Sequence, residues 1–263
     1  MAKSNKKPKD ADYDLVIAKV FKDLVKTQGR RDSYSFTKDQ IEESMMTLKA
    51  KGIVAHIRNI ADIKYTYDAR RNFPPPIAET GFWGIVGEGK SKYRFERIKQ
   101  NNLIRIPQDI STLKAQKSKI SDATPAMVRA VLGHDEQATM TKLRYNDIIS
   151  KALNINAFQV QGHERTTVSC GQIEVDEVYV GDRGKKKFII PISAKGGDKD
   201  SLSYSQALNL SLYAREKTRF AEYEPIPLGI SRRSDTGITI IRFNAANTLQ
   251  DVRIEGVFEF ELT

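Results

Sequence analysis

The 263-residue chain contains a single cysteine, Cys170, and only three histidines, His56, His134 and His163. One cysteine excludes an intrachain disulfide, and the scattered histidines leave no Cys/His cluster with the spacing of a zinc site. No apolar run reaches the length that is needed to cross a bilayer, and the opening stretch MAKSNKKPKD lacks the apolar segment of a secretory signal. We therefore expect a cytoplasmic protein in a reducing compartment.

Acidic residues are outnumbered, with 33 Asp and Glu against 43 Lys and Arg, which gives a formal net charge of +10. This excess favours a polyanionic partner. No basic helix with a bulky apolar face stands out, so we expect double-stranded DNA rather than an acidic lipid. The hydrophobic fraction of 40% and the charged fraction of 29% are typical of a soluble globular protein that buries a genuine core.

The pattern along the chain predicts a disordered basic leader over residues 1–10, an N-terminal DNA-binding module over 11–122 and a second domain over 123–263. The boundary follows a polar, weakly patterned stretch that ends in Ser-Asp-Ala-Thr-Pro. In the first module we expect helices from residue 12 to 28 and from Thr37, a candidate N-cap, to Gly52. The alternation of Ile63, Tyr65 and Tyr67 predicts a short strand.

A β-hairpin is predicted next, with strands over 81–86 and 92–98. Two helices followed by such a hairpin indicate a winged-helix-like module. A set of basic side chains would then lie near DNA: Arg70, Arg71, Lys90, Lys92, Arg94 and Arg97. The alternative for each of them is an ordinary solvated charge.

The string Gly84-Ile85-Val86-Gly87-Glu88-Gly89-Lys90-Ser91 matches the phosphate-binding P-loop pattern letter for letter. That loop requires a strand before it and a helix after it, so that a helix N-terminus holds the phosphates. The residues after Ser91 alternate as a strand, and Glu88 would bring negative charge against the phosphates. We therefore interpret the match as accidental.

The most informative stretch is Gln172 to Gly197, which predicts strands over 173–180 and 188–194 joined by a charged turn. Side chains alternate between the faces of a strand, so Glu174 and Asp176 share one face of the first strand. Ser193 and Lys195 share a face of the second strand. Carboxylate oxygens suit Mg²⁺, and a nearby lysine orients water or balances charge on a phosphate.

This arrangement resembles the PD-(D/E)xK nuclease superfamily, whose pattern is an acid on one strand and an acid-x-Lys triplet on the next. Asp176 would be the first acid, and Ser193-Ala194-Lys195 occupies the triplet. Ser193 stands where the family usually has Glu or Asp, and Glu174 would supply the missing oxygens. The resemblance implies an α/β (α+β) fold, a restriction-endonuclease-like mixed sheet flanked by helices, with Asp176 and Glu174 as Mg²⁺ ligands and Lys195 as the catalytic lysine.

The resemblance also points to residues outside the two strands. Many of these nucleases take one acid from a helix before the catalytic strands, and Glu136 has that placement; the alternative is a solvated glutamate at the start of a helix. In several branches a glutamine on the helix after the lysine strand reaches toward the site, and Gln206 has that placement. His163 and Arg165, just before the first strand, are side chains of the kind that contact phosphates and bases. His163 is equally well explained as a structural histidine.

Together these patterns predict a Mg²⁺-dependent restriction-type endonuclease that cuts double-stranded DNA. A homodimer would cut both strands, and a cognate methyltransferase acting on the same site would be a natural partner. The competing interpretation of the hairpin is a solvated edge without catalysis. The competing function is a non-catalytic DNA-binding regulator with a degenerate nuclease core, which Ser193 favours.

Overall fold

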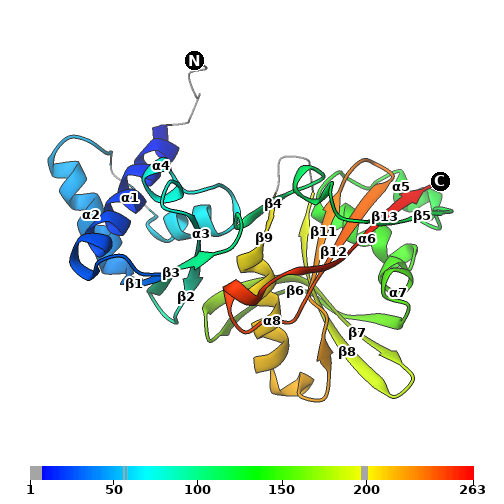
Figure 1. Cartoon of the computed structure of the whole chain (residues 1–263). Coiled ribbons are helices and arrows are strands. Elements are labelled where there is room, and N and C mark those ends of the chain that lie inside the picture. Colours follow the sequence, from blue (N-terminus) through cyan, green and yellow to red (C-terminus); the bar gives the residue numbers. More distant parts are fainter. Residues whose placement is uncertain (1–7, 56, 58, 197–200) are drawn as a thin grey trace. The chain divides into compact units, whose positions relative to one another are not determined.

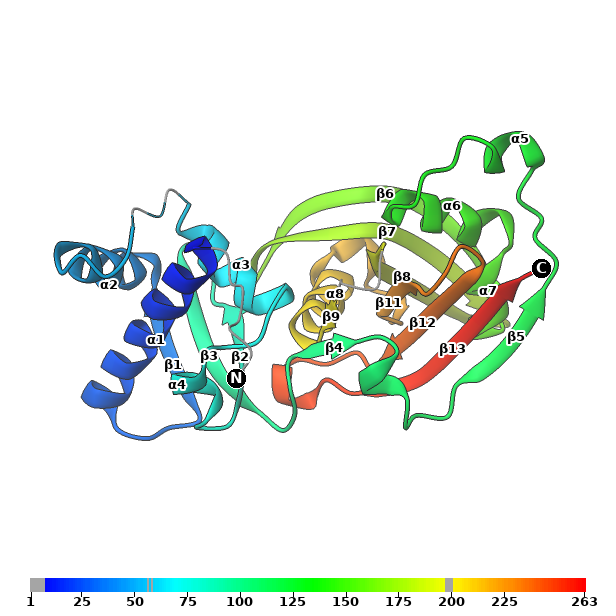
Figure 2. The ribbon, with the colours of Figure 1, turned by 90° about the horizontal axis from the view of Figure 1, so that it is seen from above.

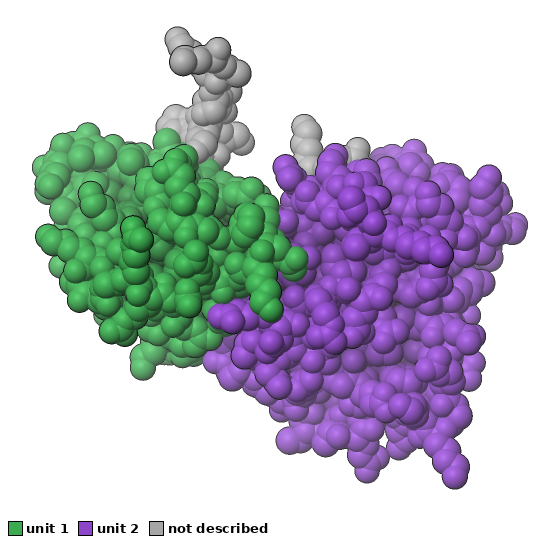
Figure 3. Space-filling view, viewed as in Figure 1, with its two compact units in different colours: residues 1–102 green, residues 103–263 purple. Residues whose placement is uncertain are grey.

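The computed structural model describes residues 8–55, 57, 59–196 and 201–263. The chain divides into two compact units, Met1–Asn102 and Leu103–Thr263 (Figure 3). Within the described ranges, no helix combines the length and the apolar character of a membrane span. The predicted disordered leader lies outside the described residues up to position 7, whereas its last residues already belong to the first helix.

The first unit combines helices with a small antiparallel sheet (Figure 1). Its elements are α1 (Pro8–Gln28), β1 (Ser33–Thr37), α2 (Lys38–Ala50), α3 (Ala61–Ala69), α4 (Pro75–Ala78), β2 (Phe82–Gly87) and β3 (Lys92–Ile98). The strands lie in the order β1-β3-β2. The predicted hairpin is thus present as β2 and β3, and β1 adds a third strand to it.

Aromatic side chains build the core of this unit. Phe21 of α1 packs edge-on against Tyr34, Trp83 and Phe95, with ring centroids 5.0–5.5 Å apart. Such edge contacts add to the stabilisation that burial of the rings provides. The predicted N-cap is also present, since Thr37 and Gln40 form a reciprocal capping box at the start of α2.

The strand that we predicted over Ile63, Tyr65 and Tyr67 is wrong, because these residues belong to helix α3. Ile63 and Tyr67 are four residues apart and both buried, whereas Tyr65 between them is 41% exposed. Positions i and i+4 share a helical face. The same three residues therefore fit a helix with one buried face.

The second unit is built on an eight-stranded mixed sheet, with seven strands in the order β5-β13-β12-β11-β8-β7-β6 and β10 beside β8. The strands are β5 (Gln116–Ile120), β6 (Asn156–Val168), β7 (Gly171–Arg183), β8 (Lys186–Lys195), β10 (Glu224–Pro225), β11 (Leu228–Arg232), β12 (Gly237–Phe243) and β13 (Ile254–Leu262). A separate pair joins β4 (Leu103–Arg105) to β9 (Ser201–Ser203). Strand β4 pairs with β9, and β5 pairs with β13, so both strands belong to the second unit. The boundary of this unit therefore falls at Leu103 and not at the predicted position 123.

Helices cover both faces of this sheet (Figure 2). The covering helices are α6 (Glu136–Tyr145), α7 (Ile148–Leu153) and α8 (Tyr204–Glu216), whereas the short helix α5 (Ala126–Arg129) has no buried residue. Ile190 and Ile192 of β8 pack in one core with α6 and α7, whereas Ile189 packs in another core with α8. Alternating residues of β8 therefore serve opposite faces, as a central strand that is buried on both sides requires. The expected α+β character is present.

Candidate active site

The candidate site lies where the antiparallel pairing of β7 with β8 ends. Their antiparallel ladder runs from Arg183 opposite Lys186 to Glu177 opposite Ile192. From Ile192 to Lys195, β8 pairs with β11 on its other side. Beyond the ladder, the Asp176 Oδ2 atom accepts a hydrogen bond of 2.7 Å from the backbone N–H of Ala194. A carboxylate thus takes the place of the next backbone acceptor, which fixes Asp176 against the predicted triplet.

The four predicted catalytic residues act on one another here. Burial raises the pKa of the Asp176 carboxyl, and the negative charge of Glu174 raises it further. The Ala194 N–H, the Lys195 ammonium and the Ser193 hydroxyl lower that pKa without reversing the shift. Glu174, Ser193 and Lys195 therefore all influence the ionisation of the Asp176 carboxyl.

Glu174 faces two cationic or titratable side chains from β6. Its Oε1 atom lies 2.9 Å from His163 Nε2, and its Oε2 atom lies 3.6 Å from Arg165 Nη2. The pairing of β6 with β7 places Arg165 directly opposite Glu174. All three side chains are substantially exposed, Glu174 by 41%. His163 and Arg165, which we predicted as DNA contacts, thus both pair with Glu174 at an exposed position.

Glu177 faces helix α6, but strict alternation does not hold along β7: Val175 packs in the core with α8, whereas Tyr179, four residues further on, packs in the core with α6 and α7. Its side chain is only 1% exposed, and its Oε1 atom lies 3.0 Å from Arg144 Nη1 of α6. Burial raises the pKa of the Glu177 carboxyl, which the charge of Arg144 partly offsets. The sequence did not indicate this ion pair, because Arg144 has the spacing of an ordinary polar helix residue.

The two accessory residues have different surroundings. Helix α6 begins beside the end of β8, so a Cβ atom at Gly196 would lie only 3.0 Å from the Glu136 backbone nitrogen. This close approach favours glycine at position 196 and places half-buried Glu136 near the end of β8. Gln206 lies in the first turn of α8, whose N-cap residue is Ser203. Its backbone N–H donates to Ser203 Oγ at 3.0 Å, and that hydroxyl lies 3.4 Å from Gln206 Oε1.

The oxygen donors of the cluster fit a hard cation. Asp176 and Glu174 provide carboxylates whose charges repel each other, and Ser193 provides a buried hydroxyl. Mg²⁺ is usually held by one or two carboxylates with water and substrate phosphate completing the shell. No group of three His, Cys, Asp or Glu side chains suited to a metal occurs among the residues with described positions. The carboxylates of Asp176 and Glu174 are the groups of this cluster that could hold such an ion.

The basic residues predicted to bind DNA in the first unit differ in their partners. Lys90 and Lys92 are exposed on the β2–β3 hairpin. Arg94 is held by two carboxylates, Glu88 at 2.5 Å and Glu96 at 2.9 Å. On α3 and just after it, Arg70 lies 3.6 Å from Asp62, and Arg71 forms an ion pair with Asp14. The two lysines are thus the better placed to contact a phosphate.

The P-loop string does not have the surroundings of a nucleotide site. Gly84–Gly87 belong to β2, and the residue after Ser91 begins strand β3. The loop therefore leads into a strand, as expected, and supplies no helix N-terminus for a phosphate.

Comparison of the chain with protein-family models, with curated proteins and with solved structures finds no match.

Proposed function

We propose that this protein is a Mg²⁺-dependent DNA endonuclease of the restriction type. The second unit would hold the catalytic site on a restriction-endonuclease-like core, and the first would be a winged-helix-like DNA-binding module. The observation that carries the proposal is the bond from the Ala194 N–H to the Asp176 carboxylate at the end of the β7–β8 ladder. This bond joins Asp176 to the Ser193-Ala194-Lys195 triplet and so supports the resemblance to the nuclease pattern. The net charge of +10 agrees with a DNA substrate.

Each residue of the cluster has a distinct role in this proposal. Asp176 and Glu174 would hold the ion, which when bound polarises the scissile phosphate and lowers the pKa of a water. Lys195 positions that water and balances the charge that develops on the phosphate. Ser193 holds a water by its hydroxyl, since a hydroxyl is a weaker cation ligand than a carboxylate. His163 and Arg165 bind the DNA backbone beside the cluster.

Cutting both strands of a duplex calls for two such sites, so we propose that the active form is a homodimer. A restriction role further implies a methyltransferase that protects the same recognition sequence, and it places the enzyme in the cytoplasm with the host DNA.

Ser193 favours a second candidate function. Its 5% exposed side chain occupies the position of the usual second acid, which suits a DNA-binding regulator whose nuclease core has lost catalysis. Such a protein would bind DNA through the basic surface and leave it intact.

Supercoiled plasmid DNA separates the two functions. The nuclease should nick or linearise it with Mg²⁺ and leave it intact with a chelator. Asp176→Asn and Lys195→Ala should each slow cleavage by about 10²–10³-fold while binding is retained. Lys187→Ala is the matched control, because Lys187 lies on the same hairpin with its side chain 54% exposed. Binding without nicking by the unaltered protein would establish the regulator.

A further inference from the structure

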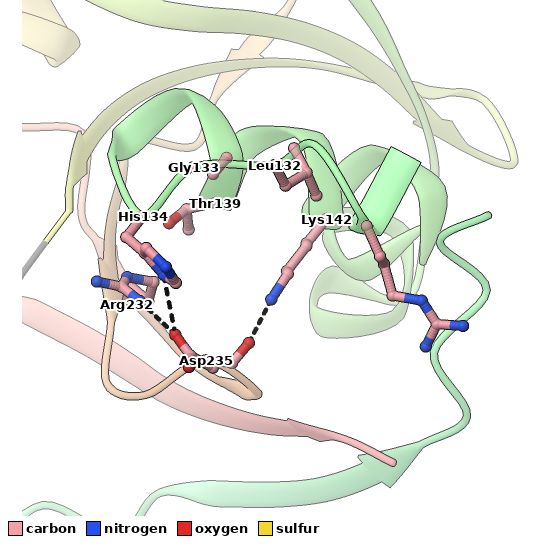
Figure 4. Close-up of a pocket in the computed structure, with 9 residues that line it drawn as sticks. Leu132, Gly133, His134, Thr139, Lys142, Arg232 and Asp235 are labelled. Atoms are coloured by element: carbon pink, nitrogen blue, oxygen red, sulfur yellow. Dashed lines mark hydrogen bonds and ion pairs between the residues drawn. The ribbon is translucent and has the colours of Figure 1, made fainter. Parts of the chain in front are cut away.

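A small basic cavity lies beside the catalytic cluster and has no role in the proposed chemistry. Its volume is about 130 Å³, and it opens between the start of α6 and the turn from β11 to β12 (Figure 4). Its charged and titratable lining residues are Arg129, His134, Lys142, Arg232 and Asp235. Three permanently cationic side chains thus line the cavity with one carboxylate, and one of them, Arg129, also lies 3.5 Å from Asp122.

Three donor side chains of this cavity contact Asp235. Its Oδ1 atom lies 2.9 Å from Arg232 Nη1 and 3.2 Å from His134 Nδ1. Lys142 donates to the Asp235 backbone carbonyl oxygen. Figure 4 shows His134, Lys142 and Arg232 converging on Asp235. The Asp235 side chain is 73% exposed on its turn, whereas that of Arg232 is only 20% exposed. The Asp235 carboxylate is therefore exposed to solvent, whereas the Arg232 guanidinium is largely buried.

The cavity is tied directly to the catalytic strand. Ser231 of β11 pairs with Lys195 of β8, which is the proposed catalytic lysine. Arg232 is the next residue after Ser231. Arg232 Nε also donates a hydrogen bond of 3.0 Å to the carbonyl oxygen of Gly196. The cavity therefore adjoins the end of β8 on which Lys195 stands.

We propose that this cavity binds a phosphate of the DNA strand that flanks the scissile phosphate. The incoming phosphate displaces the exposed Asp235 carboxylate and accepts hydrogen bonds from Arg232, His134 and Lys142. A guanidinium suits a phosphate because its planar donors match two phosphate oxygens. The inference rests on the proposed nuclease, since it places the cavity on the path of the same strand.

Two substitutions test this exchange of the Asp235 carboxylate for a phosphate: one removes a cation from the cavity, and the other removes the carboxylate. We expect Lys142→Gln to weaken binding of a labelled DNA duplex and to lower the salt slope of binding by about 0.9, the value for one lost phosphate contact. We expect Asp235→Asn to tighten binding by about two- to fivefold, which is the equivalent of one exposed charge pair. Binding is measured with a chelator present, so that it does not depend on cleavage.

Matched controls separate the cavity from charge in general. Lys117→Gln removes an exposed lysine of β5, and Glu222→Gln removes an exposed carboxylate paired with Lys187. Neither should change the salt slope. If Lys142→Gln and Asp235→Asn both behave like these controls while both lower the melting temperature, Asp235 is only a structural clamp and the proposal is overturned.

Further results show whether the cavity takes a free phosphate or a DNA phosphate, and they distinguish failure of the cavity proposal from failure of the nuclease proposal. If inorganic phosphate stabilises the unaltered protein but not Lys142→Gln, while DNA binding is the same for both, the cavity takes a free phosphate and the strand assignment is overturned. If the paired effects on DNA binding appear but plasmid is never cut, the cavity stands and the nuclease fails. If plasmid is cut normally but the paired effects are absent, the nuclease stands and the cavity proposal fails.

Discussion

The Oε1 atom of Glu177 lies 3.0 Å from Nη1 of Arg144, a residue of helix α6. Glu177 follows Asp176 directly in the chain, yet the pleat of β7 sends the two carboxylates to different surroundings. One meets the Ala194 N–H at the catalytic cluster, and the other is buried against helix α6. Two adjacent acids thus have different surroundings, one at the end of the β7–β8 ladder and the other in a buried ion pair.

The Glu177–Arg144 pair gives a stability prediction. Arg144→Ala leaves the buried Glu177 carboxylate without its counter-ion, and we expect the free energy of unfolding at neutral pH to fall by about 3–5 kcal/mol. The pKa of Glu177 is already raised by burial, and loss of Arg144 raises it further. The loss of stability should therefore shrink as the pH falls through that raised pKa, because the carboxyl becomes neutral.

Urea unfolding at neutral and mildly acidic pH measures this effect. The double variant Arg144→Ala/Glu177→Gln is the control, since it removes the buried charge and should recover part of the stability. Glu177→Gln alone should leave plasmid cleavage nearly unchanged. A large loss of cleavage in a folded Glu177→Gln protein would mean that the catalytic role belongs to Glu177 and not to the acids on the other face.

Ser193 gives a test of the triplet. Ser193→Glu restores the usual acid, and we expect the cleavage rate to be retained or to rise. The site is buried, with 5% of the side chain exposed, so the larger residue should lower the free energy of unfolding by about 1–3 kcal/mol. Ser193→Gln has nearly the same volume without the charge, and it should lose stability without gaining activity. Equal rates for the two variants would show that charge at this position is irrelevant.

The β2–β3 hairpin should contribute to DNA binding through Lys90 and Lys92. Their joint replacement by glutamine should lower the salt slope by about 1.8, or 0.9 for each phosphate contact. Arg94→Gln should leave the slope unchanged and instead lower stability, because Arg94 is held by Glu88 and Glu96. Salt titrations of duplex binding and thermal unfolding distinguish these effects. ATP hydrolysis that disappears in Lys90→Ala would restore the P-loop interpretation.

Asp122 should support the second unit at neutral pH. Burial raises the pKa of its carboxyl, but hydrogen bonds with Thr124 and Asn146 and the charge of Arg129 outweigh burial, so the pKa is lowered overall. A lowered pKa contributes stability above the unfolded-state pKa, and that stability is lost as the pH falls through the folded-state value. Asp122→Ala should cost about 1–3 kcal/mol at neutral pH.

Acid titration of the unfolding free energy checks this sign. The difference between the Asp122→Ala variant and the unaltered protein should begin to narrow below about pH 4, the ordinary pKa of the unfolded state, and should be smallest below the lowered folded-state pKa, where the carboxyl is protonated in both states. Asp182→Ala is the control, because Asp182 is exposed near the end of β7. A difference that stays constant down to low pH would mean that ionisation of Asp122 does not stabilise the fold.

The sequence by itself determined the features that depend on neighbouring residues. The residues after Ser91 indicated a strand in place of the P-loop helix, and the two predicted strands around the charged turn are present as β7 and β8. The Thr37 cap followed from local side-chain chemistry. Each of these features depends on a period or a hydrogen bond within a few residues.

Only the tertiary structure decided which distant residues meet. The pairing of β6 with β7 brings Arg165 to Glu174, and the parallel alignment of β11 with β8 brings Arg232 to Gly196. His134 and Asp235, which are 101 residues apart, lie at one cavity. Local periodicity carries no information about such partners, because strand order and register are set by burial across the whole sheet. The helical burial of Ile63 and Tyr67 was decided in the same way, by packing in the core of the first unit.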